Sequence, residues 1–269
     1  MSTSARPPQL GPVVALLTDF GTRDWYVAAL RGVILSRCPR ARLIDITHEI
    51  SPQDVVAGAL TLAAAAPWFP RGTVFLAVVD PGVGSARALL AARADGRYFV
   101  GPDNGLLAPI LAGAAQRAVV RLTNRRYWLR NVSRTFQGRD ILAPVAASLA
   151  AGRSLTRLGM SCSHITPLNL PTPQRHGRHL SGSIIHIDRF GNLITNLPAS
   201  ALASRGRRAN PTVRYRRRLV RVVSSYGAGR ARELIALANS QGLIELAVRE
   251  GSAARTSHAK RGDRVDLVT

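Results

Sequence analysis

The sequence has few cysteines, few aromatic residues and no long apolar run. Its two cysteines, Cys38 and Cys162, cannot form a disulfide framework or a cysteine metal cage, which favours a cytoplasmic protein. Aromatic residues make up only 5% of the chain, so the core must be mainly aliphatic, and a hydrophobic content of 46% suffices for one. No stretch approaches the ~20 apolar residues of a membrane-spanning helix, and the first residues lack the apolar core of a signal peptide. We therefore expect a cytoplasmic protein with no membrane partner.

Carboxylates are also scarce. The chain has 15 Asp and Glu against 37 Lys and Arg, a net charge of +22, which often indicates a nucleic-acid-binding protein. However, Lys260 is the single lysine and the arginines are scattered, apart from a dense run over residues 205–221. No zinc-finger spacing, aromatic RNA-binding motif or recognition helix accompanies that run. We do not expect nucleic acid as a partner, although binding of RNA or another polyanion through residues 205–221 stays open as an alternative.

The pattern of apolar segments predicts two domains. Strand and helix patterns alternate over residues 1–165, which indicates an α/β domain with a mostly parallel sheet. Residues 166–180 read as a linker, and residues 181–269 contain short strands and turns typical of an all-β, barrel-like domain. We expect Asp24 to cap the first helix and Ser51 to cap the second. The strands expected in the first domain are 13–17, 42–46, 73–79, 89–92 and 98–100.

Five of the eleven aspartates stand beside a glycine turn at the end of an apolar run. Ligands of α/β proteins bind outside the carboxyl ends of the strands, where such turns lie. Asp beside Gly is also ordinary turn chemistry, but five cases in an acid-poor chain favour an acidic site. The sequence has no dinucleotide-binding glycine motif, Walker lysine or Gly-x-Ser-x-Gly, and its histidines lack metal-ligand spacing. The five aspartates are Asp19, Asp80, Asp103, Asp140 and Asp188.

Seven motifs in order carry a family resemblance over almost the whole chain. Together they resemble the S-adenosyl-L-methionine (SAM) hydroxide adenosyltransferase family, the SAM hydrolases, which is related to the SAM-dependent fluorinase and chlorinase. Each motif alone is weak, whereas the ordered set is specific. The motifs are Thr18-Asp19-Phe20-Gly21, Asp45-Ile46-Thr47-His48, residues 78–84, Gly101-Pro102-Asp103-Asn104-Gly105, Thr135-Phe136-Gln137-Gly138-Arg139-Asp140, residues 188–196 and residues 239–248.

The resemblance implies an architecture and a reaction. Members of this family are homotrimers with an α/β N-terminal domain and a β-barrel C-terminal domain. SAM binds between the N-terminal domain of one subunit and the C-terminal domain of its neighbour. Water attacks the ribose C5′, which releases methionine and gives adenosine, and no metal or cofactor takes part.

The resemblance also implies which residues contact the substrate. Asp19 would hold the ribose hydroxyls, and Asp188 would pair with the methionine ammonium. Asn192 would bind the adenine edge, with Phe190 and Tyr226 packed against the ring. The remaining expected substrate contacts are Ser240 at the methionine end and Thr135 and Phe136 of the fifth motif.

The expected catalytic residues are Asp80, Arg87 and Gln137. Asp80 and Arg87 match the family's water-activating pair, including its seven-residue spacing. Gln137 stands where the family has a catalytic histidine, and glutamine cannot accept a proton. We expect Asp80 to take the proton and the side-chain carbonyl of Gln137 to orient the water. A homologue that binds SAM or adenosine without turnover is the alternative within the family.

Overall fold

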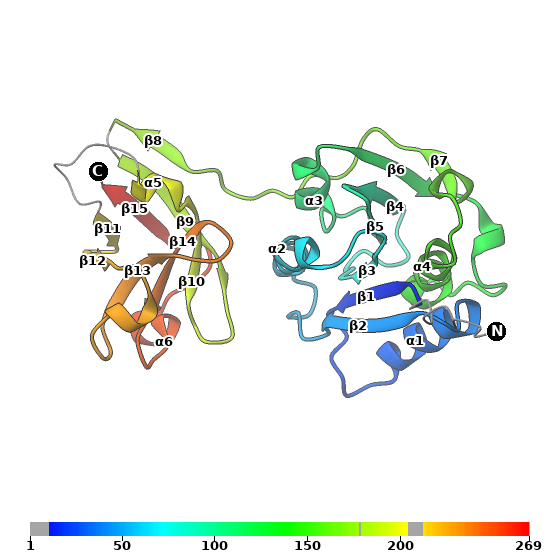
Figure 1. Ribbon diagram of the computed structural model, residues 1–269, viewed down its shortest axis with the longest axis horizontal. Helices are drawn as coiled ribbons and strands as arrows, with labels where there is room; N and C mark the ends of the chain where they lie inside the picture. Colours follow the sequence, from blue (N-terminus) through cyan, green and yellow to red (C-terminus); the bar gives the residue numbers. More distant parts are fainter. Residues whose placement is uncertain (1–10, 178, 204–211, 269) are drawn as a thin grey trace, which may run out of the picture. The chain divides into compact units, whose positions relative to one another are not determined.

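The computed structural model describes residues 11–177, 179–203 and 212–268 (Figure 1). The chain divides into two compact units, Met1–Leu168 and Asn169–Thr269. The range 166–180, which we expected to be a linker, spans this division and includes strand β8 (Gln174–His176). No helix in the described part of the chain is long and apolar enough to cross a membrane.

The first unit is built on a seven-stranded sheet in the order β2-β1-β3-β5-β4-β6-β7. Strands β2, β1, β3 and β5 pair in parallel, β4 is antiparallel to β5, and β6 is antiparallel to β4. Five of the seven strands therefore run in one direction, which confirms the α/β class with a mostly parallel sheet. The strands are β1 (Val13–Thr18), β2 (Arg42–Thr47), β3 (Val74–Val78), β4 (Leu89–Ala94), β5 (Arg97–Pro102), β6 (Arg117–Leu122) and β7 (Gly159–Ser161).

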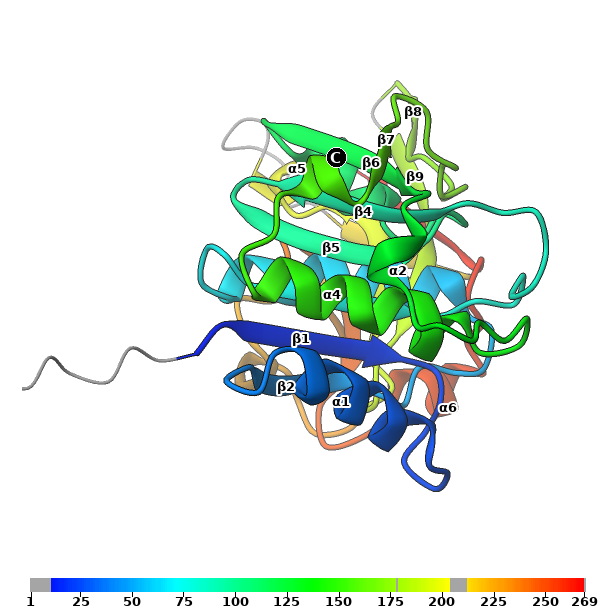
Figure 2. The same cartoon turned by 90° about the vertical axis from the view of Figure 1, so that its right-hand side faces the viewer.

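Helices cover both faces of this sheet. Successive side chains of a strand point to opposite faces, and in β1 Val14 and Leu16 join one core cluster while Ala15 and Leu17 join the other. The first cluster packs against α1 (Tyr26–Arg37) and α4 (Ala143–Ala150), which Figure 2 shows on the side of the sheet turned toward the viewer. The second packs against α2 (Val55–Ala65) and α3 (Ala108–Gly113). The central parallel strands β1 and β3 are thus buried on both faces, as their apolar sequences indicate, whereas the edge strand β2 is partly exposed.

The two helix caps expected from the sequence are wrong. Helix α2 is capped by Asp54, whose Oδ1 accepts a hydrogen bond from Ala57 N–H at 3.0 Å. Ser51 cannot begin this helix, because Gln53 has a φ of +67° and so interrupts the right-handed turn. Helix α1 has Trp25 at its N-cap, with no side-chain cap hydrogen bond from Asp24 or any other described residue.

The second unit is a closed β-barrel, as expected. Seven strands form the ring β10-β14-β13-β12-β11-β15-β9, which the antiparallel pairing of β9 with β10 closes, and β8 is appended to β9. Aliphatic side chains and Tyr215 fill its interior. The strands are β9 (His179–Ile187), β10 (Leu193–Pro198), β11 (Thr212–Tyr215), β12 (Arg218–Val222), β13 (Leu234–Ala238), β14 (Leu243–Val248) and β15 (Arg264–Val268), with short helices α5 (Ser200–Ala203) and α6 (Ala253–Ser257).

Candidate active site

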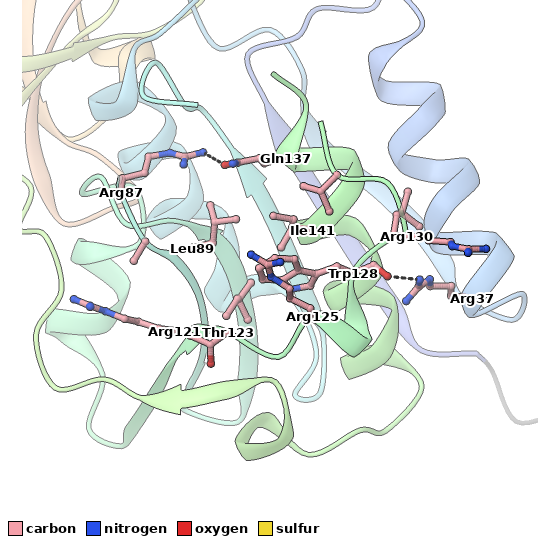
Figure 3. Close-up of a pocket in the computed structure, with 14 residues that line it drawn as sticks. Arg37, Arg87, Leu89, Arg121, Thr123, Arg125, Trp128, Arg130, Gln137 and Ile141 are labelled. Atoms are coloured by element: carbon pink, nitrogen blue, oxygen red, sulfur yellow. Dashed lines mark hydrogen bonds between the residues drawn. The ribbon is translucent and has the colours of Figure 1, made fainter. Parts of the chain in front are cut away.

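Asp80, Arg87 and Gln137 form one hydrogen-bonded group beyond the carboxyl end of β3. Arg87 Nε donates to Asp80 Oδ1 at 2.6 Å, and Arg87 Nη2 donates to Asp80 Oδ2. The same Nη2 donates to Gln137 Oε1 at 2.8 Å, the contact drawn in Figure 3. The side chains of Arg87 and Asp80 are only 9% and 6% exposed. The structure thus brings the three expected catalytic residues into contact, while their roles stay predictions.

Glycines allow the loops that carry these residues to approach closely. Gly84 has a φ of +82°, and a Cβ there would lie 2.8 Å from the backbone oxygen of Arg134. The loop after Asp80 therefore packs against the segment that leads to Gln137. On the other side of Gln137, the chain forms a π-helical turn, Gly138–Leu142, before α4 begins. Such turns are frequent at functional sites because they re-aim side chains, and here the turn starts next to Gln137.

Arg87 fixes the orientation of the Gln137 amide. A guanidinium group has only hydrogen-bond donors, so the amide oxygen of Gln137 must face it. The carbonyl that we expected to orient water therefore already accepts a bond from Arg87. The amide Nε2 has no hydrogen bond to the described residues in the structure, so Gln137 offers two N–H donors. At this position the Gln137 side chain therefore acts as a hydrogen-bond donor.

Asp19 lies at the carboxyl end of β1 and shares a cavity with Asp80. Its Oδ2 accepts a hydrogen bond from Gln53 N–H at 2.8 Å, and Gln53 takes the left-handed conformation that aims this N–H at the carboxylate. Burial raises the pKa of Asp19 above its usual value, and the nearby charge of Asp80 adds to the rise. The strand end is anchored by Thr18 Oγ1, which lies 2.8 Å from Nδ1 of the buried His48.

The cavity has a volume of about 650 Å³ and combines these carboxylates with an aromatic wall. Phe20, Trp25 and Tyr26 each lie edge-on to Phe136, with ring centroids 5.9, 5.6 and 5.4 Å away. Arg139 lies 5.0 Å from the Phe136 centroid. An aromatic wall beside carboxylates suits a ligand that combines an aromatic ring with a positive charge. Phe20, Trp25 and Tyr26 were missed in the sequence, although the run Asp19-Phe20…Trp25-Tyr26 concentrates aromatics in an aromatic-poor chain.

Thr135 is held at this cavity by hydrogen bonds that lead to the buried carboxylate of Asp140. Asp140 is fully buried and accepts from Arg139 Nε at 2.6 Å. Asp140 Oδ2 also accepts from Ser133 N–H at 2.8 Å, and Ser133 Oγ lies 3.0 Å from Thr135 Oγ1. The carboxylate of Asp140 therefore shapes the loop that presents Thr135 and Phe136 to the cavity.

Within the first unit, the aspartates at glycine turns do not all line one cavity. Asp19 and Asp80 line the cavity, and Asp140 is buried beneath it. Asp103 accepts a hydrogen bond from Thr166 N–H at 2.7 Å and so fixes the end of the first unit. Asp188 belongs to the second unit. Turn chemistry accounts for Asp103, so the acidic-site interpretation was too broad.

The second unit places Asp188 and Asn192 in one turn between β9 and β10. Asp188 accepts from the backbone N–H of Asn192 at 2.8 Å and from its side-chain Nδ2 at 3.1 Å. Gly191 has a φ of +85°, and a Cβ there would collide with Ser252. The amide nitrogen expected to bind adenine thus donates to Asp188 in this structure. Phe190 is 76% exposed, and Ser240 lies exposed in the turn between β13 and β14.

Tyr226 is fixed by a buried carboxylate that the sequence analysis missed. Its hydroxyl donates to Glu245 Oε1 at 2.6 Å, and Glu245 is 3% exposed. Burial raises the pKa of Glu245, and the charge of Asp188 adds to the rise; burial and the bond to Glu245 raise the pKa of the Tyr226 phenol well above its usual range. A lone acid in the apolar strand β14 was the available signal. Asp188, Tyr226 and Glu245 thus form one electrostatically coupled cluster.

Some arginines of the dense run over residues 205–221 are neutralised by nearby acids. Arg205, Arg207 and Arg208 lie outside the described residues. Arg216 pairs with Asp263, and Arg221 forms two hydrogen bonds with Glu233, which lower the pKa of that carboxyl to about 2. Within residues 11–177, 179–203 and 212–268, no cluster of three or more His, Cys, Asp or Glu side chains could hold a metal ion.

Known proteins match the chain along nearly its whole length. Residues 14–159 match the SAM hydroxide adenosyltransferase N-terminal domain, and residues 182–266 match the C-terminal domain of the same family. The chain is 39% identical over 265 residues to the (R)-S-adenosyl-L-methionine hydrolase of Salinispora tropica, which covers 94% of this chain and 97% of that protein.

A more distant relative and a solved structure also match most of the chain. A fluorinase of an Actinoplanes species is 31% identical over 227 residues, which covers 74% of this chain and 76% of that protein. The crystal structure of an uncharacterized conserved protein from Thermotoga maritima superposes with a TM-score of 0.88 at 34% identity, which covers 95% of this chain and 100% of that one. These matches confirm the resemblance seen in the sequence motifs, and the chain belongs to the SAM hydroxide adenosyltransferase family.

Proposed function

We propose that this protein hydrolyses SAM to adenosine and L-methionine by attack of water on the ribose C5′. The observation that carries the proposal is the contact of Asp80 with Arg87 and Gln137 beside a cavity that also holds Asp19. SAM carries a positive sulfonium, and carboxylates that face the cavity favour a cation in an otherwise strongly basic chain. The 39% identity to a named SAM hydrolase supports the same reaction.

The proposed reaction is a single displacement. The water oxygen forms a bond to C5′ while the C5′–S bond breaks, and the bonding electron pair goes to sulfur. Methionine leaves as a neutral thioether, so the leaving group needs no general acid. The attacking water becomes a protonated alcohol, and its proton passes to Asp80. Because the sulfonium itself activates C5′, the reaction requires no metal or cofactor.

Arg87 and Gln137 act in this proposal by holding Asp80. The two hydrogen bonds from Arg87 keep the carboxylate oriented until it receives the proton. Gln137 accepts through its carbonyl oxygen from Nη2, the same guanidinium nitrogen that donates to Asp80 Oδ2. Its amide N–H groups are then free to donate to the water oxygen. Gln137 is therefore a positioning residue here and takes no proton.

The substrate contacts proposed for the second unit complete the site. Asp188, Asn192, Phe190, Tyr226 and Ser240 would hold the methionine and adenine parts of SAM. We propose that neighbouring copies of the chain contribute the two residue sets, in a homotrimer. A mass measurement in solution tests this assembly, and a monomer that still binds SAM tightly argues against it.

A second candidate function is SAM or adenosine binding without turnover. Its support is Gln137, which supplies no titratable group where the family has histidine. Transfer of a halide is less favourable than either, because the buried carboxylate of Asp80 would repel an anion at the point of attack.

Hydrolysis in water enriched in ¹⁸O separates these functions. The expected products are methionine and adenosine with ¹⁸O at the 5′-oxygen, formed equally with and without EDTA. Adenosine at the spontaneous background rate, with SAM still bound, supports the binding protein. Formation of a 5′-halogenated nucleoside in chloride or fluoride supports halide transfer. Loss of activity in EDTA that a divalent ion restores contradicts the metal-free reaction.

A further inference from the structure

The first unit contains a second cavity, of about 890 Å³, which borders the catalytic group (Figure 3). Arg87 and Gln137 line it, so it meets the catalytic residues at the Arg87–Gln137 hydrogen bond. Five of its lining residues are arginines and none is an aspartate or glutamate. The arginines are Arg37, Arg87, Arg121, Arg125 and Arg130.

Two of these arginines build the cavity wall. Arg37, at the end of α1, donates to the backbone oxygens of Tyr127 and Trp128 at 3.0 and 2.9 Å, and Figure 3 shows the second of these bonds. Arg125 lies over the indole ring of Trp128, with its guanidinium carbon 5.5 Å from the ring centroid. The aromatic side chain and its loop are therefore fixed by cations that keep their positive charge.

Among the described residues, Arg121, Arg125 and Arg130 carry positive charges that no nearby acid neutralises, whereas Arg87 pairs with Asp80. Across the described ranges, no carboxylate lies within 4 Å of the guanidinium nitrogens of Arg121, Arg125 or Arg130. Arg121 is exposed at the end of β6, where the strand alternates between core and surface. The indole Nε1 of Trp128 is buried and has no hydrogen-bond partner among the described residues. Arginine and indole N–H groups are donors only, so the arginines give the cavity an excess of hydrogen-bond donors and positive charge.

We propose that this cavity binds a small molecule that carries condensed phosphate groups. Arginine forks bind phosphate oxygens with two parallel hydrogen bonds, which lysine cannot do. A single phosphate would occupy a small part of a cavity larger than the proposed substrate cavity. A chain of phosphates can reach several arginines at once, and Trp128, Leu89 and Ile141 supply an apolar surface for an attached organic group. Inorganic tripolyphosphate and a nucleoside triphosphate share this chemistry.

The site is connected to the catalytic group through Arg87. The guanidinium that holds Asp80 also lines this cavity. An anion bound there competes with Asp80 for Arg87, which weakens the hydrogen bonds between Arg87 and the Asp80 carboxylate. We therefore expect the bound phosphate compound to slow turnover. This inhibitory effect rests on the proposed hydrolase function, whereas the binding itself does not.

Direct binding tests the site on the full chain. Calorimetric titrations use tripolyphosphate, ATP and inorganic phosphate at low salt, with R121Q/R125Q as the variant. We expect tripolyphosphate and ATP to bind, and affinity to fall by about tenfold or more in the variant, because it loses charge-assisted hydrogen bonds. The matched control, R93Q/R153Q, removes two exposed arginines outside the cavity and should bind as the parent does. A preference for ATP over tripolyphosphate identifies a nucleotide, and equal affinity identifies condensed phosphate alone.

Other results overturn the proposal. The proposal is wrong if neither tripolyphosphate nor ATP binds at low salt, or if R121Q/R125Q binds them as tightly as the parent does. It is also wrong if a short RNA binds more tightly than tripolyphosphate and R121Q/R125Q still binds that RNA. If the double variant melts without cooperativity, the same titrations are made with V132D. This variant places a carboxylate in the cavity and must abolish the binding of tripolyphosphate and ATP. Turnover of SAM measured with and without tripolyphosphate then tests the connection to Arg87. If the protein has no turnover, the titrations still decide whether the site exists.

Discussion

Arg87 grips both carboxylate oxygens of Asp80, which precedes it by seven positions in the chain. The turn between them reverses the chain within a few residues, with Val83 N–H bonded to Asp80 O at 3.2 Å and Ser85 N–H bonded to Gly82 O at 3.0 Å. This short local connection brings the two side chains together within one turn of the chain. It also leaves the second lone pair of each carboxylate oxygen for a proton from the cavity.

Replacement of Asp80 by Asn should abolish turnover and leave SAM binding measurable. The amide keeps the shape but cannot accept the proton, and such groups contribute ~10²–10⁴-fold to rates. Single-turnover rates and a separate binding titration provide the measurement. Asp95→Asn, in a turn outside the cavity, is the matched control and should keep the parent rate. A near-native rate in Asp80→Asn means that another group accepts the proton.

Replacement of Arg87 by Lys should lower kcat more than it changes KM. An ammonium keeps the charge but cannot donate to both Asp80 oxygens and to Gln137 in the geometry of the planar fork. The carboxylate then loses its orientation, which matters chiefly in the transition state. Steady-state kinetics of Arg87→Lys measure the effect. The control is Arg93→Lys, at an exposed position on β4. Equal rates for both variants would show that charge alone is needed.

Replacement of Gln137 by His should raise turnover, because it restores a titratable group beside the reacting water. Arg87 offers only donors, so the imidazole must face it with an unprotonated nitrogen. The gain should therefore be present above the imidazole pKa of ~6.5 and vanish as the pH falls below it. A pH–rate profile of parent and variant measures this. Unchanged or lower turnover with intact SAM affinity means that Gln137 is itself the functional residue.

Replacement of Asp19 by Asn should stabilise the protein at neutral pH while weakening SAM binding. Burial raises the pKa of Asp19 in the folded state, so the ionised carboxylate costs free energy of folding there. Folding favours the protonated form, and stability is lost as the pH rises through the folded-state pKa. Thermal melts of both proteins from pH 7 toward pH 4 should show a difference in melting temperature that decreases as the pH falls. A lower melting temperature for Asp19→Asn at pH 7 contradicts this account.

Replacement of Gly191 by Ala should destabilise the barrel unit by about 1–3 kcal/mol, because it adds a Cβ in the left-handed region against Ser252. The turn that joins Asp188 to Asn192 would distort, so SAM binding should weaken as well. Denaturant titration measures the stability, with Gly227→Ala as the control, since open space surrounds that glycine. Equal effects of the two substitutions would remove the argument for a strained turn.

Local features of the site were predictable, whereas its walls were not. The order of the motifs and the seven-residue spacing predicted that Asp80 and Arg87 form a pair, and the structure joins them across a short turn. The side chains that converge from distant segments, Trp25 with Phe136 and Tyr226 with Glu245, depend on tertiary packing that the local sequence does not encode. The amide orientation of Gln137 likewise became visible only when Arg87 lay beside it.

Helix starts were mispredicted for a related reason. Ser51 and Pro52 resemble a helix start by composition, but the contact of Gln53 N–H with Asp19 selects a left-handed backbone between them and α2. A residue that serves the site thus overrides the local preference of the chain. Strand β6 was not predicted because its two exposed arginines interrupt the apolar pattern, and these same positions face outward.

The closed ring of the second unit also bears on how the protein avoids self-association. A sheet with open edges offers unpaired backbone groups to other chains, and the pairing of β9 with β10 removes that opportunity from the ring strands. The appended β8 is three residues long and carries the exposed, polar side chains of Gln174, Arg175 and His176. So short and polar a strand is a poor template for strand addition. Strand addition to the ring would therefore first require one of its strand pairs to separate, which ties resistance to aggregation to the stability of the closed ring.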